Sequence, residues 1–212
     1  GASTACPHYA TPLARLCCAA CRAAGCAISW APQGWPPPTT ERHNLAMATV
    51  TLAGTPVTTV GELPQVGSPA PTCELVANDL SPIKLGDYAG KRVVLNIFPS
   101  IDTGVCAASV HHFNKLAGGL DNTVVLCVSN DLPFAQGRFC GAEGIENVAT
   151  ASGFRSKFGQ HYGLTMAQGP LSGLLARAVV VIEPDGTVGY VQLVPEIKQE
   201  PDYDAVVEYL GN

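Results

Sequence analysis

The sequence has little charge and no basic surplus. Charged residues make up 14% of its 212 positions, and the formal net charge is −5 at pH 7. From residue 47 onward, 9 Lys and Arg stand against 16 Asp and Glu, so the main body is more acidic than the chain as a whole. This balance argues against nucleic acid or an anionic membrane as a partner.

Long hydrophobic runs are missing as well. The longest apolar stretch lies in the first 46 residues, where Arg22 and Pro32 interrupt it, and it is too short to span a bilayer. The apolar residues, 47% of the chain, suit a globular core instead. The length allows one domain of ordinary size with an appendage.

Cysteine is scarce outside the N-terminal region. The main body holds only four of the 9 cysteines, namely Cys73, Cys106, Cys127 and Cys140, and the others lie within the first 26 residues. So few cysteines in a domain with a full apolar complement do not indicate a secreted scaffold held together by disulfides. We therefore expect a reducing compartment and a cytoplasmic location.

The first 46 residues differ in composition from the rest. An Ala- and Cys-rich start leads into the Pro-rich "WAPQGWPPPTTERHNLA", and no acidic residue precedes Glu41. We predict a poorly ordered extension over residues 1–46 and one folded domain over residues 47–212. The extension resembles a transit segment, and it is equally consistent with residues upstream of a natural start at Met47.

The main body has the pattern of an α/β protein. Two Thr- and Val-rich runs around a Gly-Thr-Pro turn predict a β-hairpin over residues 49–60. The segments "RVVLNIF" (92–98) and "TVVLCVS" (123–129) are typical of strands buried on both faces. A helix is expected between them from apolar residues at helical spacing, which are Val110, Phe113, Leu116, Ala117 and Leu120.

The C-terminal half continues this pattern. The segment "NDLPFAQGRFCG" predicts a short helix with Asp131 as its N-cap and Gly141 after its last turn, so Cys140 falls at its end. A Pro-Asp-Gly turn joins two strands in residues 177–194. A final helix carries Val206, Val207 and Leu210 on one face. Together these elements predict a thioredoxin-like α/β sandwich with a mixed central sheet and flanking helices.

The stretch "NIFPSIDTGVCAASVHHF" places a thiol at the opening turn of a helix. If Thr103 is the N-cap, Cys106 lies three residues later, where backbone N–H groups lack intrahelical partners and carry partial positive charge. That charge stabilises a thiolate, which is the nucleophilic form of the sulfur. The position therefore predicts an activated cysteine.

Two further residues extend this candidate site. Pro99 closes the strand that precedes the helix, and it has no N–H group to hydrate. Arg177, in "GLLARAVVVIE", interrupts an apolar strand entry, where an unpaired charge is costly to bury. It completes an oxyanion-binding cluster with Thr103, or it extends its charged end to water from the strand terminus; periodicity does not decide between the two.

Pro99, Thr103 and Cys106 form a P-x-x-x-T-x-x-C motif that resembles the motif of peroxiredoxins. The flanking segments "VVLNIFPSIDTGVCAASV", "TVVLCVSNDLPFAQGRFCGAEG" and "GLLARAVVVIE" are similar to those of bacterial thiol peroxidases, the atypical two-cysteine branch. The resemblance covers nearly everything from about Val50 to Leu210 and leaves out the first 46 residues.

The resemblance implies a role for each candidate residue. Cys106 matches the peroxidatic cysteine and Cys140 the resolving cysteine, while Pro99, Thr103 and Arg177 match the set that binds the peroxide. Hydrogen peroxide and alkyl hydroperoxides would be reduced through a cysteine sulfenic acid and an intramolecular disulfide. The family also implies the N-terminal hairpin, a homodimer and reduction by thioredoxin, and we expect no cofactor and no metal.

A disulfide between the two thiols sets a geometric demand. Its Cα atoms must lie within about 7 Å of each other, so cysteines on separate helices require local unwinding of one helix or both. A thioredoxin-like disulfide reductase is disfavoured because its thiols lie two residues apart, whereas 33 residues separate Cys106 from Cys140. A peroxide-sensing switch or a binding module without fast turnover stays compatible with the sequence.

The remaining thiols and imidazoles are predicted to be inert. Cys127 lies in the middle of a strand, and Cys73 stands where this family usually carries Phe, so both are expected to fill core space. Cys18 and Cys21 have neither the context of a redox motif nor a second ligand pair, which leaves only opportunistic metal binding. Three histidines are likewise assigned no role, namely His111, His112 and His161.

Overall fold

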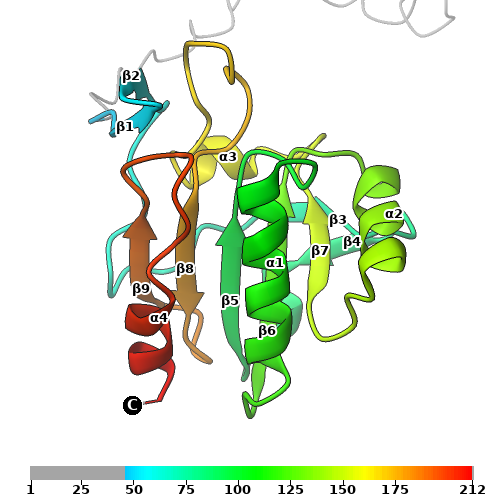
Figure 1. Cartoon of the computed structure of the whole chain (residues 1–212). Coiled ribbons are helices and arrows are strands. Elements are labelled where there is room, and N and C mark those ends of the chain that lie inside the picture. Colours follow the sequence, from blue (N-terminus) through cyan, green and yellow to red (C-terminus); the bar gives the residue numbers. More distant parts are fainter. Residues whose placement is uncertain (1–45, 212) are drawn as a thin grey trace, which may run out of the picture. The chain divides into compact units, whose positions relative to one another are not determined.

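The computed structural model describes residues 46–211 and centres on a seven-stranded mixed sheet (Figure 1). In spatial order its strands are β4 (Pro82–Lys84), β3 (Glu74–Val76), β7 (Ala149–Ser152), β6 (Thr123–Ser129), β5 (Arg92–Ile97), β8 (Ala178–Ile182) and β9 (Val188–Leu193). The helices are η1 (Leu85–Tyr88), α1 (Gly104–Ala117), α2 (Pro133–Glu143), α3 (Phe158–His161) and α4 (Tyr203–Leu210). This arrangement confirms the predicted thioredoxin-like α/β sandwich.

The structure bears on the predicted N-terminal extension and on membrane-spanning helices. The extension predicted over residues 1–46 lies outside the described residues apart from its last position, so the boundary between extension and domain stays a prediction. Among residues 46–211, no helix combines the length and the apolar character that crossing a bilayer requires.

The centre of the sheet is the predicted strand, helix, strand unit. β5 and β6 are parallel neighbours joined by α1, and β8 pairs antiparallel with the other side of β5. One face of this centre packs against Val110 and Phe113 of α1 and Val206 of α4. The other face packs against Phe158 and Tyr162, at and just after α3. Because both faces are covered, the end of β5 is held firmly where the chain turns toward α1.

The helix that carries Cys140 differs from its prediction at both ends. α2 has Leu132 rather than Asp131 as its N-cap, and it continues through Gly141 to a left-handed cap at Gly144, whose φ is 64°. The prediction of an Asp131 cap is wrong because that carboxylate accepts hydrogen bonds from another loop, at Ile101. Cys140 therefore lies inside the helix and not at its end.

The remaining elements match the predictions with small differences. β1 (Thr49–Leu52) and β2 (Thr55–Thr58) form the expected antiparallel hairpin, but its turn lies at Ala53 and Gly54, with φ of 51° and 80°. β8 and β9 are antiparallel as predicted. In α4, Val206 and Leu210 are buried, but Val207 is 42% exposed, so the prediction was wrong about that residue.

Glu196 joins the hairpin to the loop after β9. Its carboxylate accepts hydrogen bonds from the Thr51 hydroxyl and from the backbone N–H groups of Ala53, Gly54 and Lys198. These bonds, led by the one from Thr51, lower the pKa of Glu196 from 4.5 to about 2. The hairpin is therefore attached most firmly when this side chain is ionised.

We expect the stability contributed by Glu196 to depend on pH. Its pKa is lower in the folded protein than in the unfolded chain, so the contribution is fully present above about pH 5 and is lost as the pH falls toward about 2. In urea unfolding, Glu196→Gln should destabilise the protein at neutral pH, and its difference from wild type should shrink across this window. Glu146→Gln, at an exposed glutamate elsewhere, serves as the control. A difference that stays constant with pH would contradict the prediction.

Candidate active site

Cys106 lies in the first turn of α1, and its side chain is fully buried. The N-cap of the helix is Thr103, as predicted, but the Thr103 side chain does not cap a helical N–H group. Its hydroxyl donates instead to the Cys106 sulfur, at 2.7 Å, and contacts the Ser100 carbonyl oxygen at 3.2 Å. The local spacing therefore places a hydrogen-bond donor directly against the thiol.

Arg177, the residue just before β8, reaches the same sulfur. Its side chain is 1% exposed, so the alternative in which the charged end extends to water is wrong. Nη2 donates to the Cys106 sulfur at 3.3 Å, and Nε and Nη2 both donate to the Ile197 carbonyl oxygen, at 3.1 and 3.0 Å. β8 lies beside β5 in the sheet, and this pairing brings the guanidinium to the start of α1.

One nitrogen of the Arg177 guanidinium, Nη1, is buried and has no hydrogen-bond acceptor among the described residues. A buried charged donor without a partner is costly, and sites that bind an oxygen-containing ligand carry such donors. Nη1 can therefore donate to an oxygen atom of a bound ligand.

A pocket of about 490 Å³ adjoins these groups. Pro99, Thr103 and Arg177 all line it, so the structure brings the predicted peroxide-binding set together. The rest of the wall is largely apolar and comes from segments far apart in the sequence, including Leu52, Val105, Leu171, Leu174 and Ile197. Such a wall excludes water from the sulfur and strengthens the hydrogen bonds around it.

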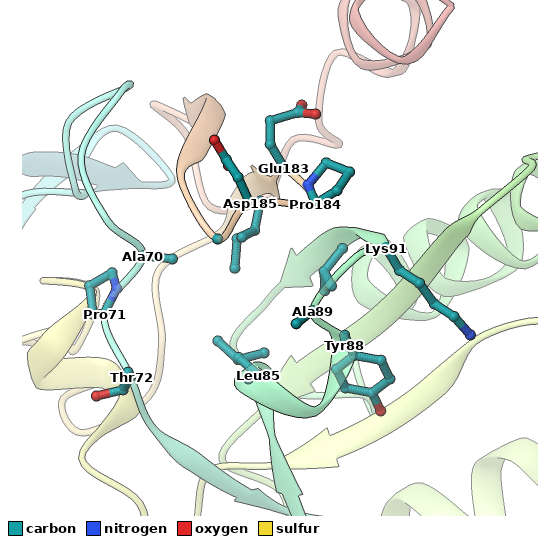
Figure 2. A pocket seen from close by; sticks show the side chains of 14 residues that line it. Ala70, Pro71, Thr72, Leu85, Tyr88, Ala89, Lys91, Glu183, Pro184 and Asp185 are labelled. Atoms are coloured by element: carbon teal, nitrogen blue, oxygen red, sulfur yellow. The ribbon is translucent and has the colours of Figure 1, made fainter.

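A second pocket lies at the other end of β5 (Figure 2). It is formed by the loop at Pro71, by Leu85 and Tyr88, and by the turn between β8 and β9 at Asp185. None of the five predicted site residues lines it. The candidate site is therefore the pocket beside Cys106.

Cys140 is not part of this cluster. It lies on α2, half-buried, and its sulfur is 3.8 Å from the Thr150 hydroxyl oxygen. It lines another hollow, with Asn78, Ile83 and Ile145. Both Cys106 and Cys140 are free cysteines in the structure.

The other described cysteines are poorly ionised, as expected of inert thiols. Burial raises the pKa of Cys127 to about 12, and burial likewise raises the pKa of Cys73 to about 12. Cys127 is fully buried in β6, and Cys73 packs partly buried against the core. At neutral pH neither supplies a thiolate.

The histidines have structural partners. His111 lies 3.1 Å from a Glu143 oxygen, and His112 stacks on Tyr203 with ring centroids 3.7 Å apart. His161 had no partner in the sequence analysis, but its Nδ1 lies 3.1 Å from the Thr72 carbonyl oxygen. That the imidazoles take no part in the chemistry stays a prediction.

Sequence reasoning missed the Ile197 carbonyl, which holds the guanidinium in place. A backbone acceptor leaves no mark in residue identity. The only usable signal was the neighbouring Glu196, whose carboxylate organises the loop. The sequence analysis assigned Asp131 as a helix N-cap, whereas its carboxylate accepts a hydrogen bond from the Ile101 N–H.

The fold and the buried thiol at the start of α1 are those of a redoxin. A family model described as Redoxin matches residues 65–207, which include all five predicted site residues. Among solved structures, a peroxiredoxin-like protein from Aquifex aeolicus is 45% identical, with a TM-score of 0.75, and the match covers 78% of this chain and 97% of that one.

Two bacterial relatives identify the branch of this family more closely. A thiol peroxidase of Mycobacterium tuberculosis is 59% identical over 165 residues, which cover 78% of this chain and 99% of that protein. A thiol peroxidase of Corynebacterium glutamicum is 54% identical, with coverage of 78% and 100%. The chain therefore belongs to the thiol peroxidase family and is an enzyme of the peroxiredoxin class, which confirms the resemblance.

We expect Arg177→Lys to lower the second-order rate constant for peroxide by about 100-fold, as loss of one transition-state donor typically does. A lysine ammonium keeps the charge but cannot contact the Cys106 sulfur and the Ile197 carbonyl in the same planar geometry. Stopped-flow oxidation of the reduced protein measures this constant. Arg138→Lys, at an exposed ion pair with Asp102, is the matched control. A rate equal to wild type in Arg177→Lys would show that only the charge matters.

Proposed function

We propose that this protein reduces hydrogen peroxide and alkyl hydroperoxides with Cys106 as the peroxidatic cysteine and Cys140 as the resolving cysteine. The observation that carries the proposal is the convergence of the Thr103 hydroxyl and the Arg177 guanidinium on one buried sulfur. Both groups are hydrogen-bond donors, and such donors bind a charged acceptor more strongly than a neutral one. A guanidinium that is 1% exposed also needs an anionic partner, which a thiolate supplies.

In the first step the Cys106 thiolate attacks the terminal oxygen of the hydroperoxide. The S–O bond forms as the O–O bond breaks, the sulfur loses two electrons, and the leaving oxygen takes a proton to become water or an alcohol. Thr103 and the free Nη1 of Arg177 orient the peroxide and offset the charge that develops on the leaving oxygen. Pro99 shapes the wall of the pocket beside them.

In the second step the Cys140 thiol attacks the sulfenic acid on Cys106. The disulfide forms and one water molecule leaves, which protects Cys106 from oxidation to sulfinic acid. Cys140 lines a hollow that does not include Cys106, and Cys106 itself is fully buried, so this step requires part of the thiol-bearing segments to move.

Thioredoxin is the proposed reductant of the disulfide. The protein itself is proposed to be a homodimer and to lie in the cytoplasm. These three points rest on the family resemblance and on the small number of cysteines in the main body. The disulfide accepts two electrons and two protons from the thioredoxin dithiol, and the enzyme returns to its starting state.

The apolar wall supports alkyl hydroperoxides as substrates beside hydrogen peroxide. Leu52, Leu171 and Leu174 offer an organic substituent a surface to pack against, which hydrogen peroxide cannot use. The wall therefore favours binding of the organic part without contributing to attack at the oxygen.

The decisive experiment is peroxide turnover with thioredoxin and its reductase. Cys106→Ser should be inactive, because a serine hydroxyl is too weakly acidic to supply an anion at neutral pH. Wild type should cycle rapidly, whereas a peroxide-sensing switch would be oxidised once without fast turnover. Substantial activity in Cys106→Ser would remove the basis of the proposal.

Cys140→Ser should reduce one equivalent of peroxide and then stop, because the first step needs only the Cys106 site. Excess peroxide should drive its Cys106 to sulfinic acid. Peptide mapping of oxidised wild type should show a link between Cys106 and Cys140 within one chain. Cys73→Ser is the matched control and should cycle normally. If Cys140→Ser cycles while Cys73→Ser does not, the resolving cysteine has been misassigned.

A further inference from the structure

α2, the helix that carries Cys140, has little fully buried apolar surface, although Phe139 and Cys140 pack partly buried against the core. Of its residues only Pro133 and Gln136 are buried, and one of these is polar. A helix with few buried apolar contacts opens at a lower free energy than the elements of the core. The polar contacts that fix α2 therefore decide when it can move.

One carboxylate connects this helix to the segment that carries Cys106. Asp131, just before α2, accepts hydrogen bonds from the Ser100 hydroxyl at 2.7 Å and from the Ile101 N–H at 2.7 Å. Ser100 and Ile101 belong to the loop that leads from β5 to Thr103 and Cys106. Hydrogen bonds to an ionised acceptor are roughly twice as strong as those between neutral groups, so Asp131 holds this loop firmly.

The same carboxylate is connected to the body of α2. Asp131 also accepts a hydrogen bond from Ser129, at 2.6 Å, and the Ser129 hydroxyl oxygen accepts one from the Gln136 amide, at 3.0 Å. Gln136 further donates to the Ala151 carbonyl at 3.3 Å, and Ser152 donates to the Asp131 carbonyl. Ser129 and Gln136 are fully buried, so water does not replace these bonds cheaply.

We propose that Asp131 is a positioning residue that holds both thiol-bearing segments in the conformation that reacts with peroxide, and that release of its network frees them for disulfide formation. The inference rests on the proposed roles of Cys106 and Cys140. It assigns Asp131 opposite effects on the two chemical steps. An intact network holds the Thr103 hydroxyl against the Cys106 sulfur. A broken network lets α2, with Cys140, move toward Cys106.

The test is Asp131→Asn in the full chain, followed by stopped-flow mixing with one equivalent of hydrogen peroxide. We expect oxidation of Cys106 to slow by about tenfold or more, because the loop before Thr103 is less well positioned. Conversion of the sulfenic acid to the disulfide should be as fast as in wild type or faster. Sulfinic acid formation under excess peroxide should fall accordingly. Asp131→Ala, which removes all three acceptor contacts, should show the same pattern more strongly.

Asp102→Asn is the matched control. It removes an exposed ion pair with Arg138, at 3.1 Å, which joins the same loop to α2. Exposed pairs contribute little, so both rates should stay within about threefold of wild type.

Two results would overturn the inference: equal slowing of both steps in Asp131→Asn, which indicates general destabilisation, or no change in either step. In both cases wild type would still form the disulfide between Cys106 and Cys140. Failure of the proposed function is distinct, because wild type itself would then form no such disulfide.

Discussion

The site depends on one buried cation. The Arg177 guanidinium is 1% exposed and lies between the Cys106 sulfur and the Ile197 carbonyl oxygen. An isolated charge at that depth costs several kcal/mol, so its surroundings must supply negative or strongly dipolar partners. The sulfur and the carbonyl are these partners, and the antiparallel pairing of β5 with β8 brings them within reach.

Segments distant in sequence are needed to keep that carbonyl in place. Ile197 donates its own N–H to the Thr51 carbonyl, and the Glu196 carboxylate accepts three hydrogen bonds from the hairpin, from the Thr51 hydroxyl and from the N–H groups of Ala53 and Gly54. The hairpin also contributes Leu52 to the pocket wall. It therefore supports the orientation of Arg177 and lines the pocket beside Cys106, so the two-stranded hairpin is part of the candidate site.

Sequence reasoning predicted the parts of the site that are local. Thr103 and Cys106 are three residues apart at a helix start. Free backbone N–H groups and the positive end of the helix dipole lie there, so the local sequence alone indicates a site for an anionic sulfur. The fate of Arg177 was undecided because strand periodicity does not say whether a terminal residue turns inward. Asp131 was misread as a cap because N-cap preference ranks residue types and ignores a competing tertiary donor such as Ile101 N–H. The short strands β3, β4 and β7 escaped notice because three or four residues hold too little periodicity.

The two sides of the Cys106 thiol are built differently, and this difference constrains how the proposed disulfide with Cys140 can form. On the Arg177 side the contacts involve a buried charge and the Ile197 carbonyl oxygen, so moving that side would leave a cation without partners. On the α2 side the contacts are a small polar network and a helix with two buried residues. Local unfolding occurs in the segment whose opening costs the least free energy, which here is the α2 side. In the proposed resolving step, the approach of Cys140 to Cys106 should therefore proceed by loosening of α2 and of the loop before α1, while β8 and Arg177 stay in place.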